Sequence, residues 1–272
     1  MALQSGAVAD LRLGTSGWSY PEWVGRFYPN GTQPGRMLDF YGRIFATVEA
    51  HSTYRRAPDI STLVRWRSQV PADFKFAPKV HLAITHRRDL QGVEDRLGAF
   101  YQAVSTLGSN LGPLLFSLPY QQPDLDRLDR LLAGLPPGGP QAAFDLAPAW
   151  LIPAVFDRLE AHGASVVLTD CERGEPPVLH VGPLVYVRLR RERYDRAQLE
   201  AWANRLAAEA AAGFETYAFF KHDDVGDGPR YARRLADAVT RKNPEASGFD
   251  VPGGEAPDAM AQDVQAPRSE IS

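Results

Sequence analysis

Short apolar runs alternate with amphipathic stretches along most of the chain, and this alternation is the strongest constraint on its fold. Several runs are continuous in hydrophobicity rather than alternating, which is typical of strands buried on both faces of a sheet. Eight such runs occur: LRLGTSGW (11–18), TVEAHST (47–53), FKFAPKV (74–80), LGPLLFSL (111–118), QAAFDL (141–146), SVVLTD (165–170), LVYVRLR (184–190) and ETYAFFKH (215–222).

The segments between many of these runs carry apolar residues at helical spacing. Helices are predicted at residues 36–45, 93–107, 125–132, 149–159, 198–211 and 231–239. Strands that alternate with helices indicate an α/β protein with a parallel sheet. Eight units in a chain of 272 residues match the size of a (β/α)₈ TIM barrel, which is about 250 residues. We therefore predict a single closed TIM barrel.

One unit of the predicted barrel is irregular. The segment CERGEPPVLHVGP, residues 171–183, has too many prolines and too few residues for a full crossover helix. We expect an irregular or missing helix between strands six and seven. An open doubly wound sheet is the alternative fold, but the sequence has no GxGxxG and no P-loop motif to favour it.

The composition changes near residue 243. Residues 243–272 are rich in acidic side chains and contain four prolines, with little to bury in a core. That composition is typical of a disordered segment. We therefore predict one domain over residues 1–242 and a disordered acidic tail over residues 243–272.

The cysteine content and hydropathy favour a cytoplasmic protein. Cys171 is the only cysteine, so an intrachain disulfide and a thiolate metal cluster are excluded. No apolar run approaches the roughly 20 residues that span a membrane. The first residues, MALQSGAVADLRLG, lack the basic and apolar regions of a signal peptide. We expect a cytoplasmic location and no membrane partner.

Polar side chains collect at the carboxyl ends of the predicted strands, where the active site of a TIM barrel lies. Polar residues also gather at inactive strand ends, but acids, a lysine and arginines converging from several strands favour a functional site. The candidate catalytic residues are Glu49, His51, Lys79, His86, Asp145 and Asp170. The candidate substrate-binding residues are Trp18, Tyr20, Arg188, Arg190 and His222.

The loop after the first predicted strand, GWSYPEWVGRFYPNG (17–31), is dense in aromatic residues. Two interpretations remain open for this loop. It is either a lid that packs over the mouth of the barrel or a stacking surface for a base or sugar ring.

Several motifs in this order resemble the YecE-like family, domain of unknown function seventy-two. They are GTSGWSYPEWVGRFYP, VEAHSTY, FKFAPKVHLAITH, LGPLLFSLP and YVRL, and the resemblance covers about residues 12–240. It implies a TIM barrel related by fold to endonuclease IV and sugar isomerases, without an established activity. The matched positions are Gly14, Trp18, Tyr20, Trp23, Tyr28, Pro29, Glu49, Thr53, Lys79, Thr85, His86, Asp170 and Arg188.

The chain departs from the family pattern mainly at the predicted carboxyl-terminal face. His51 replaces an expected Asn, Arg55 a Tyr and Ser117 a Gln. FDLAPAW keeps Asp145 but lacks the Arg-His expected before its Trp. An expected His-Gly pair is Arg190-Arg191, and an expected Asn-Asn pair is Lys221-His222. These changes indicate either a retuned site or a site that has lost activity and kept binding.

Three functions fit these residues. The first is a hydrolase or lyase that acts on a phosphate-bearing or nucleic-acid-derived substrate, because arginines at strand ends grip anions. The second is a non-catalytic protein that binds an anion or another ligand. The third, ranked last, is a glycoside hydrolase, which needs two opposed carboxylates. Glu49, Asp145 and Asp170 are the acids available for that role.

The sequence identifies no cofactor and no metal. A divalent ion would have nitrogen and oxygen ligands to choose from in His51, His86, His222, Glu49, Asp145 and Asp170. No HxH or HExxH motif supports such a site. The expected partner is a small anionic or phosphate-bearing ligand. Nucleic acid is a weaker alternative, and the pattern does not specify an oligomeric state.

Overall fold

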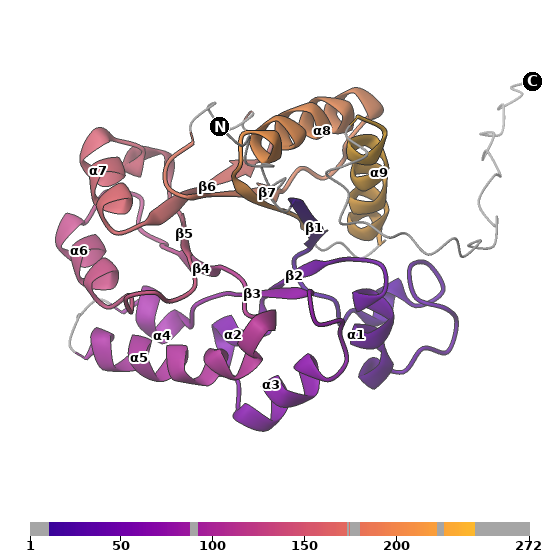
Figure 1. The fold of residues 1–272 in the computed structure, drawn as a ribbon, viewed down its shortest axis with the longest axis horizontal. Coiled ribbons are helices and arrows are strands. Elements are labelled where there is room, and N and C mark those ends of the chain that lie inside the picture. The colour runs from indigo at the N-terminus through magenta and orange to yellow at the C-terminus, as the bar shows by residue number, and fades with distance from the viewer. Residues whose placement is uncertain (1–10, 88–91, 173, 175–179, 222–225, 243–272) are drawn as a thin grey trace, which may run out of the picture.

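The computed structural model describes residues 11–87, 92–172, 174, 180–221 and 226–242. Within these ranges eight strands alternate with helices, and every strand runs parallel to the strands it pairs with. Figure 1 shows the strands around the centre of the molecule and the helices outside them. The predicted α/β class is therefore confirmed.

Six strands form the larger sheet. Their order is β1 (Leu11–Thr15), β8 (Glu215–Phe220), β7 (Leu184–Leu189), β6 (Ala164–Asp170), β5 (Ala142–Asp145) and β4 (Leu114–Ser117). The pairing of β7 with β8 runs from Leu184 opposite Glu215 to Leu189 opposite Phe220. All residues of β7 are buried, which explains its nearly continuous apolar sequence.

The two remaining strands form a separate small sheet. β2 (Thr47–Ala50) pairs with β3 (Lys75–Pro78) along its whole length. Only isolated bridges connect this pair to its neighbours, such as Ser16 to Glu49 and Lys79 to Leu115. The prediction of a closed eight-stranded TIM barrel is therefore wrong: the protein has a six-stranded half-barrel sheet and a two-stranded sheet.

A tyrosine side chain interrupts the sheet between β1 and β2. The backbone N–H of Thr15 donates to the Tyr41 hydroxyl at 2.8 Å, and that hydroxyl donates to the Thr47 carbonyl at 3.1 Å. A phenol therefore takes the place of a direct backbone ladder. Gly14 allows the close approach, because a Cβ there would lie 2.2 Å from the Thr47 oxygen.

A proline interrupts the sheet on the other side of the pair. The backbone N–H groups of Lys75 and Lys79 donate towards the β2 side, to Ala46 and Ala50. The N–H of Val80 donates to Leu115 instead, so even-numbered positions face β4. Pro78 is one of these positions and has no N–H to donate, which breaks the ladder to β4.

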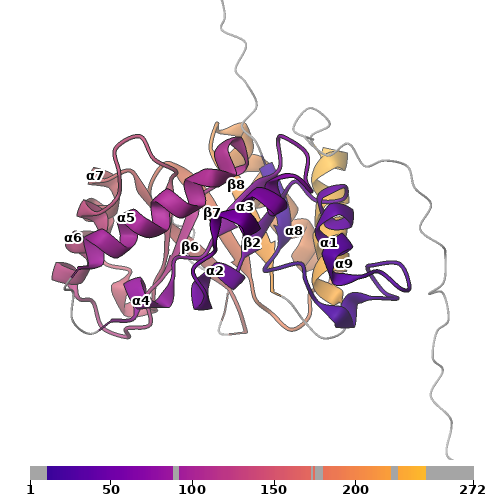
Figure 2. The same cartoon turned by 90° about the horizontal axis from the view of Figure 1, so that it is seen from below.

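The helices pack outside the strands. They are α1 (Pro34–Gly42), α2 (Ser52–Arg55), α3 (Ile60–Arg67), α4 (Leu82–Thr85), α5 (Val93–Val104), α6 (Leu125–Ala133), α7 (Pro153–Ala161), α8 (Arg196–Ala211) and α9 (Asp227–Lys242). Short 3₁₀ turns lie at η1 (Pro21–Trp23), η2 (Ser105–Asn110) and η3 (Pro148–Trp150). Figure 2 shows α5, α3 and α1 in a row across the side of the molecule that carries β2.

One of these helices, α3, was not predicted from the periodicity. Its outer face carries Ile60 and Val64, which are 62% and 53% exposed, so its apolar residues do not form a single inward stripe. A local signal was nevertheless present, because Asp59 accepts a hydrogen bond from the Thr62 N–H at 2.8 Å and caps the helix.

Three other predictions fall partly or wholly outside the described residues. The connection from β6 to β7 has no helix at residues 171, 172, 174 and 180–183, and its other positions are not described. The predicted tail, residues 243–272, and the candidate residue His222 also lie outside the described ranges. The division into a domain over 1–242 and a tail stays a prediction.

An apolar cluster between the strands supports the polar residues at the carboxyl ends of the strands, which we call the polar edge. It is built from inward-facing strand residues and includes Leu115, Val167, Tyr186 and Phe219, all almost fully buried. Tyr186 also donates its hydroxyl to Glu49, so the cluster directly adjoins the polar residues at the strand ends. The carboxyl ends of the parallel strands meet here, which is where polar groups from distant parts of the chain come together.

Candidate functional site

Glu49 is the centre of the polar edge. It lies in β2 and its side chain is fully buried. The Ser16 hydroxyl donates to its Oε1 at 2.8 Å, and the Tyr186 hydroxyl donates to its Oε2 at 2.8 Å. Ser16 directly follows β1 and Tyr186 lies in β7, so this carboxylate joins the two sheets, between which the described residues form no continuous backbone ladder.

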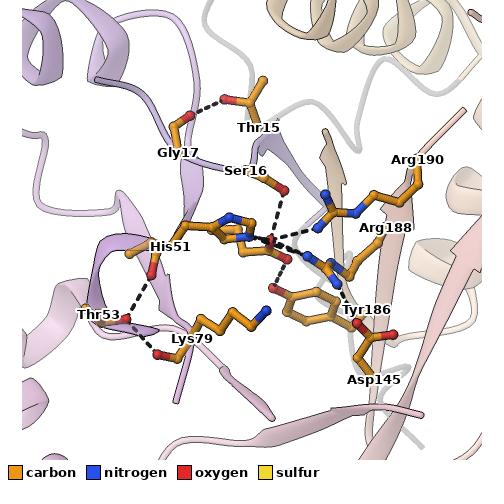
Figure 3. Close-up of polar contacts among 12 residues, drawn as sticks. Thr15, Ser16, Gly17, His51, Thr53, Lys79, Asp145, Tyr186, Arg188 and Arg190 are labelled. Atoms are coloured by element: carbon orange, nitrogen blue, oxygen red, sulfur yellow. Dashed lines mark hydrogen bonds and ion pairs between the residues drawn. The ribbon is translucent and has the colours of Figure 1, made fainter. Parts of the chain in front are cut away.

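Arg188 extends the network across the interior. Its Nη2 donates to Glu49 Oε1 at 3.0 Å, and its Nη1 forms an ion pair with Asp145 Oδ2. The Thr169 hydroxyl also donates to Asp145, at 3.3 Å. Figure 3 shows the guanidinium of Arg188 next to Asp145 and the Tyr186 ring. β2, β5 and β7 therefore each contribute one member of a buried ion-pair network.

His51 and Arg190 approach the same carboxylate from the exposed side. His51 Nε2 is hydrogen-bonded to Glu49 Oε1, and Arg190 Nη2 lies 3.5 Å from that oxygen. The His51 side chain keeps 29% of its surface exposed, and its Nδ1 has no hydrogen-bond partner among the described residues. One ring nitrogen is thus fixed by a buried acid, while the rest of the ring reaches solvent.

The electrostatics keep Glu49 ionised. Burial alone raises the pKa of a carboxyl, but the charges of Arg188 and His51 and the hydrogen bonds from His51 and Ser16 outweigh it. They hold the pKa of Glu49 well below its usual range. Burial and the neighbouring Glu49 charge raise the pKa of Tyr186 well above its usual value, so this phenol stays a proton donor.

Lys79 directly follows β3, and its side chain points towards Tyr186 and Arg188 (Figure 3). Its ammonium lies 4.1 Å from the centre of the Tyr54 ring. The Tyr54 hydroxyl is hydrogen-bonded to His86 Nε2 at 2.8 Å, and His86 Nδ1 to the Thr85 hydroxyl at 2.8 Å. Within the described ranges, no carboxylate lies in ion-pairing distance of the Lys79 ammonium.

The pKa values of Lys79 and His86 are both lowered. Burial and then the Arg188 charge lower the pKa of Lys79, against the opposing effect of Glu49 and Asp145. Burial and the Lys79 charge likewise lower the pKa of His86. The cations Lys79, Arg188 and Arg190 outnumber the carboxylates Glu49 and Asp145 by one, so the edge carries excess positive charge before His51 is considered.

A pocket of about 650 Å³ opens next to His51. Trp18, Tyr20 and Trp66 supply its aromatic walls, together with backbone and side chains from the start of α1. Trp18 packs edge-on against Trp66 with ring centres 4.9 Å apart, and the Tyr20 hydroxyl donates to the Ser16 carbonyl at 2.7 Å. His51 therefore belongs both to the charged network and to the pocket wall.

Asp170 does not join the Glu49 network. Its Oδ1 accepts from Arg191 Nε at 2.7 Å and its Oδ2 accepts from Trp202 Nε1 at 2.9 Å. Tyr194 lies beside this group: its hydroxyl accepts from the Arg191 N–H at 3.3 Å, and burial raises the pKa of the phenol. No hydrogen bond between described side chains links Asp170 to Glu49, Lys79 or His51.

The structure thus brings most of the candidate residues into two adjoining groups. Glu49, His51, Asp145, Arg188 and Arg190 form one network, and Lys79 and His86 lie together beside it. Trp18 and Tyr20 line the pocket. The roles assigned to all of these residues stay predictions.

Sequence reasoning missed four residues of the site: Ser16, Tyr54, Trp66 and Tyr186. A signal existed for Tyr186, because it lies two positions before Arg188 in a strand and successive even positions share a face. Trp66 had no such signal, since its helix was not predicted.

In the described ranges, no three His, Cys, Asp or Glu side chains are arranged to hold a metal ion. No helix in those ranges is long and apolar enough to cross a membrane.

Comparison with known families agrees with the motifs. The profile described as "Protein of unknown function DUF72" matches residues 12–254, which is most of the chain. The chain belongs to the DUF72 family. The resemblance inferred from the motifs is therefore confirmed, and the family description gives no activity.

Individual relatives support the same assignment. The chain is 29% identical over 109 residues to the UPF0759 protein YecE of Escherichia coli K12. That match covers 40% of this chain and 38% of YecE, well under two thirds of the relative's length.

Solved DUF72 structures have the same fold at low sequence identity. A DUF72 family protein of Thermotoga maritima superposes with a TM-score of 0.74 at 20% identity, covering 85% of this chain and 99% of that one. One from Enterococcus faecalis gives 0.68 at 16% identity, covering 85% and 95%.

Proposed function

We propose that this DUF72 protein is a hydrolase or lyase that acts on a small phosphate-bearing or nucleic-acid-derived substrate at the carboxyl-terminal edge of its strands. One observation carries the proposal. His51 is held by the buried Glu49 through one nitrogen and forms part of the wall of the aromatic pocket. A histidine placed in this way is suited to proton transfer at a bound substrate.

The Glu49–His51 pair has the geometry of an oriented acid–base group. An ionised carboxylate fixes the ring and stabilises the imidazolium that forms when the histidine takes a proton. Glu49 is suited to this supporting role because its pKa is held low and its oxygens are occupied by Ser16, Tyr186 and Arg188. In this proposal His51 moves the proton, and Glu49 positions it.

Arg190 and Lys79 are the groups that would bind the anion. Arg188 is committed to Glu49 and Asp145, whereas Arg190 makes one long contact of 3.5 Å to Glu49. Lys79 has no carboxylate partner among the described residues. A phosphate beside these two cations would offset the excess positive charge, and the aromatic walls of Trp18, Tyr20 and Trp66 would stack a planar ring.

The same contacts disfavour a glycoside hydrolase. That chemistry needs one carboxyl that stays protonated to act as the general acid. Glu49 and Asp145 share Arg188, and the pKa of Glu49 is held low rather than raised. Asp170 is bound to Arg191 and Trp202 outside the network.

Non-catalytic anion binding is the second candidate function. It is favoured by the one cation in excess at this site, because Lys79 forms no ion pair with a described carboxylate while Glu49 and Asp145 are both held by Arg188. Binding alone would need Arg190, Lys79 and the pocket but not the proton-transfer capacity of His51.

The experiment is a thermal-shift and turnover screen with nucleotides, sugar phosphates and inorganic phosphate. We expect at least one phosphorylated compound to raise the melting temperature of the wild type and to be converted. His51→Gln should keep the shift and lose roughly 100-fold or more in rate. His162→Gln, at an exposed position, is the matched control and should change neither. A shift without turnover selects the binding function, and no shift with any compound rejects both.

A further inference from the structure

The position of the Lys79 side chain is fixed by backbone contacts at its base. Its N–H donates to the Ala50 carbonyl at 3.2 Å, and its own carbonyl accepts from the Thr53 hydroxyl at 2.7 Å. Thr53 also donates to the Ala50 carbonyl at 2.8 Å. The start of α2 thus anchors Lys79 next to β2, while the side chain remains partly accessible.

The surroundings of the Lys79 ammonium are unusual for a lysine. The two nearest acids of the network, Glu49 and Asp145, are both held by Arg188, so neither forms an ion pair with Lys79. An ordinary structural lysine at this edge would pair with one of them. The Lys79 side chain instead points towards Tyr186 and Arg188 (Figure 3), and its ammonium lies over the Tyr54 ring.

This environment favours the uncharged amine. Removal from water penalises an ammonium ion, and a neighbouring guanidinium repels it, so both effects lower the pKa of Lys79. A lysine that is desolvated beside another cation is activated as a nucleophile towards carbonyl carbon.

We propose that Lys79 forms a Schiff base with a small aldehyde or ketone that carries a phosphate or carboxylate group. This rests on the proposed function and narrows it from hydrolase or lyase to lyase chemistry. The anion would bind beside Arg190, which places the carbonyl carbon within the positively charged edge that contains Lys79.

The covalent step balances without an external oxidant or reductant. The lone pair of Lys79 Nζ attacks the carbonyl carbon, so a C–N bond forms while the C=O π bond breaks and its electron pair moves to oxygen. A proton then moves from nitrogen to oxygen to give a carbinolamine. The C–O bond then breaks with the addition of one proton, water leaves, and the nitrogen lone pair forms the C=N bond. The Tyr54–His86 hydrogen-bonded pair beside Lys79 supplies that proton.

The resulting iminium ion gives the site its chemical use. It withdraws electrons from the neighbouring carbon–carbon or carbon–hydrogen bond, as in lysine-dependent lyases. His51, held by Glu49 and 3.4 Å from Arg188 Nη2, is placed to take or return a proton at the bound substrate.

The test is borohydride trapping on the full chain. The protein is incubated with dihydroxyacetone phosphate, glyceraldehyde 3-phosphate, pyruvate or unphosphorylated dihydroxyacetone, and sodium borohydride reduces any imine to a stable secondary amine. Peptide mapping is clear-cut because the chain has only four lysines: Lys75, Lys79, Lys221 and Lys242. We expect adduct at Lys79 in at least tenfold excess over the other three with one or more anionic carbonyls.

Two variants control the trapping. Lys79→Arg keeps the charge but cannot form an imine, so it should lose the adduct. Lys75→Arg changes the lysine at the opposite end of β3, whose ammonium donates to the Ser109 carbonyl at 2.7 Å, and should keep it. The peptide map of the wild-type protein locates the adduct without any variant, so the test remains decisive even if a variant folds poorly.

The outcomes separate this inference from the proposed function. Equal labelling of all four lysines, or none at Lys79 with any of the four compounds, overturns the Schiff base. If a phosphorylated compound still raises the melting temperature, the proposed function survives that result. Equal trapping at Lys79 of phosphorylated and unphosphorylated ketone supports the imine and removes the anion requirement from the proposed function.

Discussion

Two buried carboxylates at the carboxyl ends of strands, Glu49 of β2 and Asp170 of β6, differ in where their partners come from. Their residues are 0% and 1% exposed, and each meets an arginine. Asp170 is bound by Arg191, which follows β7, and by Trp202, which lies in α8. Glu49 is bound by Tyr186 and Arg188 of β7 and by residues that directly follow strands: Ser16 after β1, His51 after β2 and Arg190 after β7.

That difference separates a structural contact from a candidate site. Asp170 is satisfied by partners close in the chain to one another, and its contacts fasten α8 to the strand edge. Glu49 shares Arg188 with Asp145 and holds a partly exposed His51 beside a pocket, and no described carboxylate pairs with Lys79. Uneven pairing of charges with displaced pKa values is typical of functional sites, whereas complete local pairing is typical of stabilising contacts.

The largest expected effect comes from Arg188→Met. The substitution removes the cation that the buried Glu49 shares with the partly exposed Asp145, so we expect the free energy of unfolding to fall by about 3–5 kcal/mol. Chemical denaturation at neutral pH measures this loss. Arg43→Met is the matched control, because Arg43 pairs with Asp39 on the surface with 66% of its side chain exposed. A loss below about 1 kcal/mol for Arg188→Met would mean that the network is solvated and that the contrast with Asp170 is mistaken.

Glu49→Gln should come next, with a loss of about 3 kcal/mol at neutral pH because Arg188 and His51 lose a charged partner. The loss should depend on pH. The folded-state pKa of Glu49 lies below its ordinary value of 4.5, so its contribution is complete above pH 4.5 and disappears as the pH falls through the lowered pKa. Wild type and variant should therefore converge in acid. Parallel stability curves down to pH 2 would contradict the lowered pKa.

Tyr186→Phe should have a smaller effect of about 1.5–3 kcal/mol, since it removes one hydrogen bond to an ionised, buried carboxylate. Tyr194→Phe is the comparison beside Asp170, because the Tyr194 hydroxyl accepts a hydrogen bond from the Arg191 N–H at 3.3 Å. Asp170 keeps Arg191 and Trp202 in that variant, so the loss should be nearer 1 kcal/mol. Thermal and urea unfolding measure both losses. If the two variants lose the same free energy of unfolding, the distinction between the two carboxylates is wrong.

Much of the fold was readable from sequence because local patterns determine it. All eight apolar runs contain a strand, and the helices predicted around residues 93–107 and 198–211 are α5 and α8. The continuity of the sheet was not readable, because it depends on a tyrosine hydroxyl from α1 that stands between β1 and β2. It also depends on which side of β3 Pro78 faces.

The site was readable in outline for a similar reason. Parallel strands bring their ends together, so listing polar residues at strand ends recovered Glu49, Asp145 and Arg188. Which acid pairs with which cation is a matter of three-dimensional distance, and that separated Asp170 from the rest. The isolation of the Lys79 ammonium follows from the prior commitment of both acids to Arg188, which no linear pattern encodes.

The smallest expected effect is that of Lys79→Met, and its contrast with Arg191→Met is the sharpest test of the comparison. Arg191 neutralises Asp170 at 2.7 Å, so its removal strands a buried acid and should cost several kcal/mol, about 3–5. Lys79 neutralises nothing directly. Its removal loses a contact with the Tyr54 ring, worth about 0.5–1 kcal/mol, and relieves repulsion with Arg188.

These two terms oppose each other, so Lys79→Met should change the free energy of unfolding by less than about 1 kcal/mol in either direction at neutral pH. The lowered pKa means that the folded protein binds this proton more weakly than the unfolded chain does. This weaker proton binding lowers the free energy of unfolding of the wild type. The loss should vanish as the pH rises through the lowered pKa towards 10.5, the ordinary lysine value. Urea unfolding between pH 7 and pH 10.5 measures this. A loss of 3 kcal/mol or more in the free energy of unfolding would show that Lys79 is a structural cation like Arg191. A lysine that serves chemistry rather than stability should instead be replaceable with little change in that free energy.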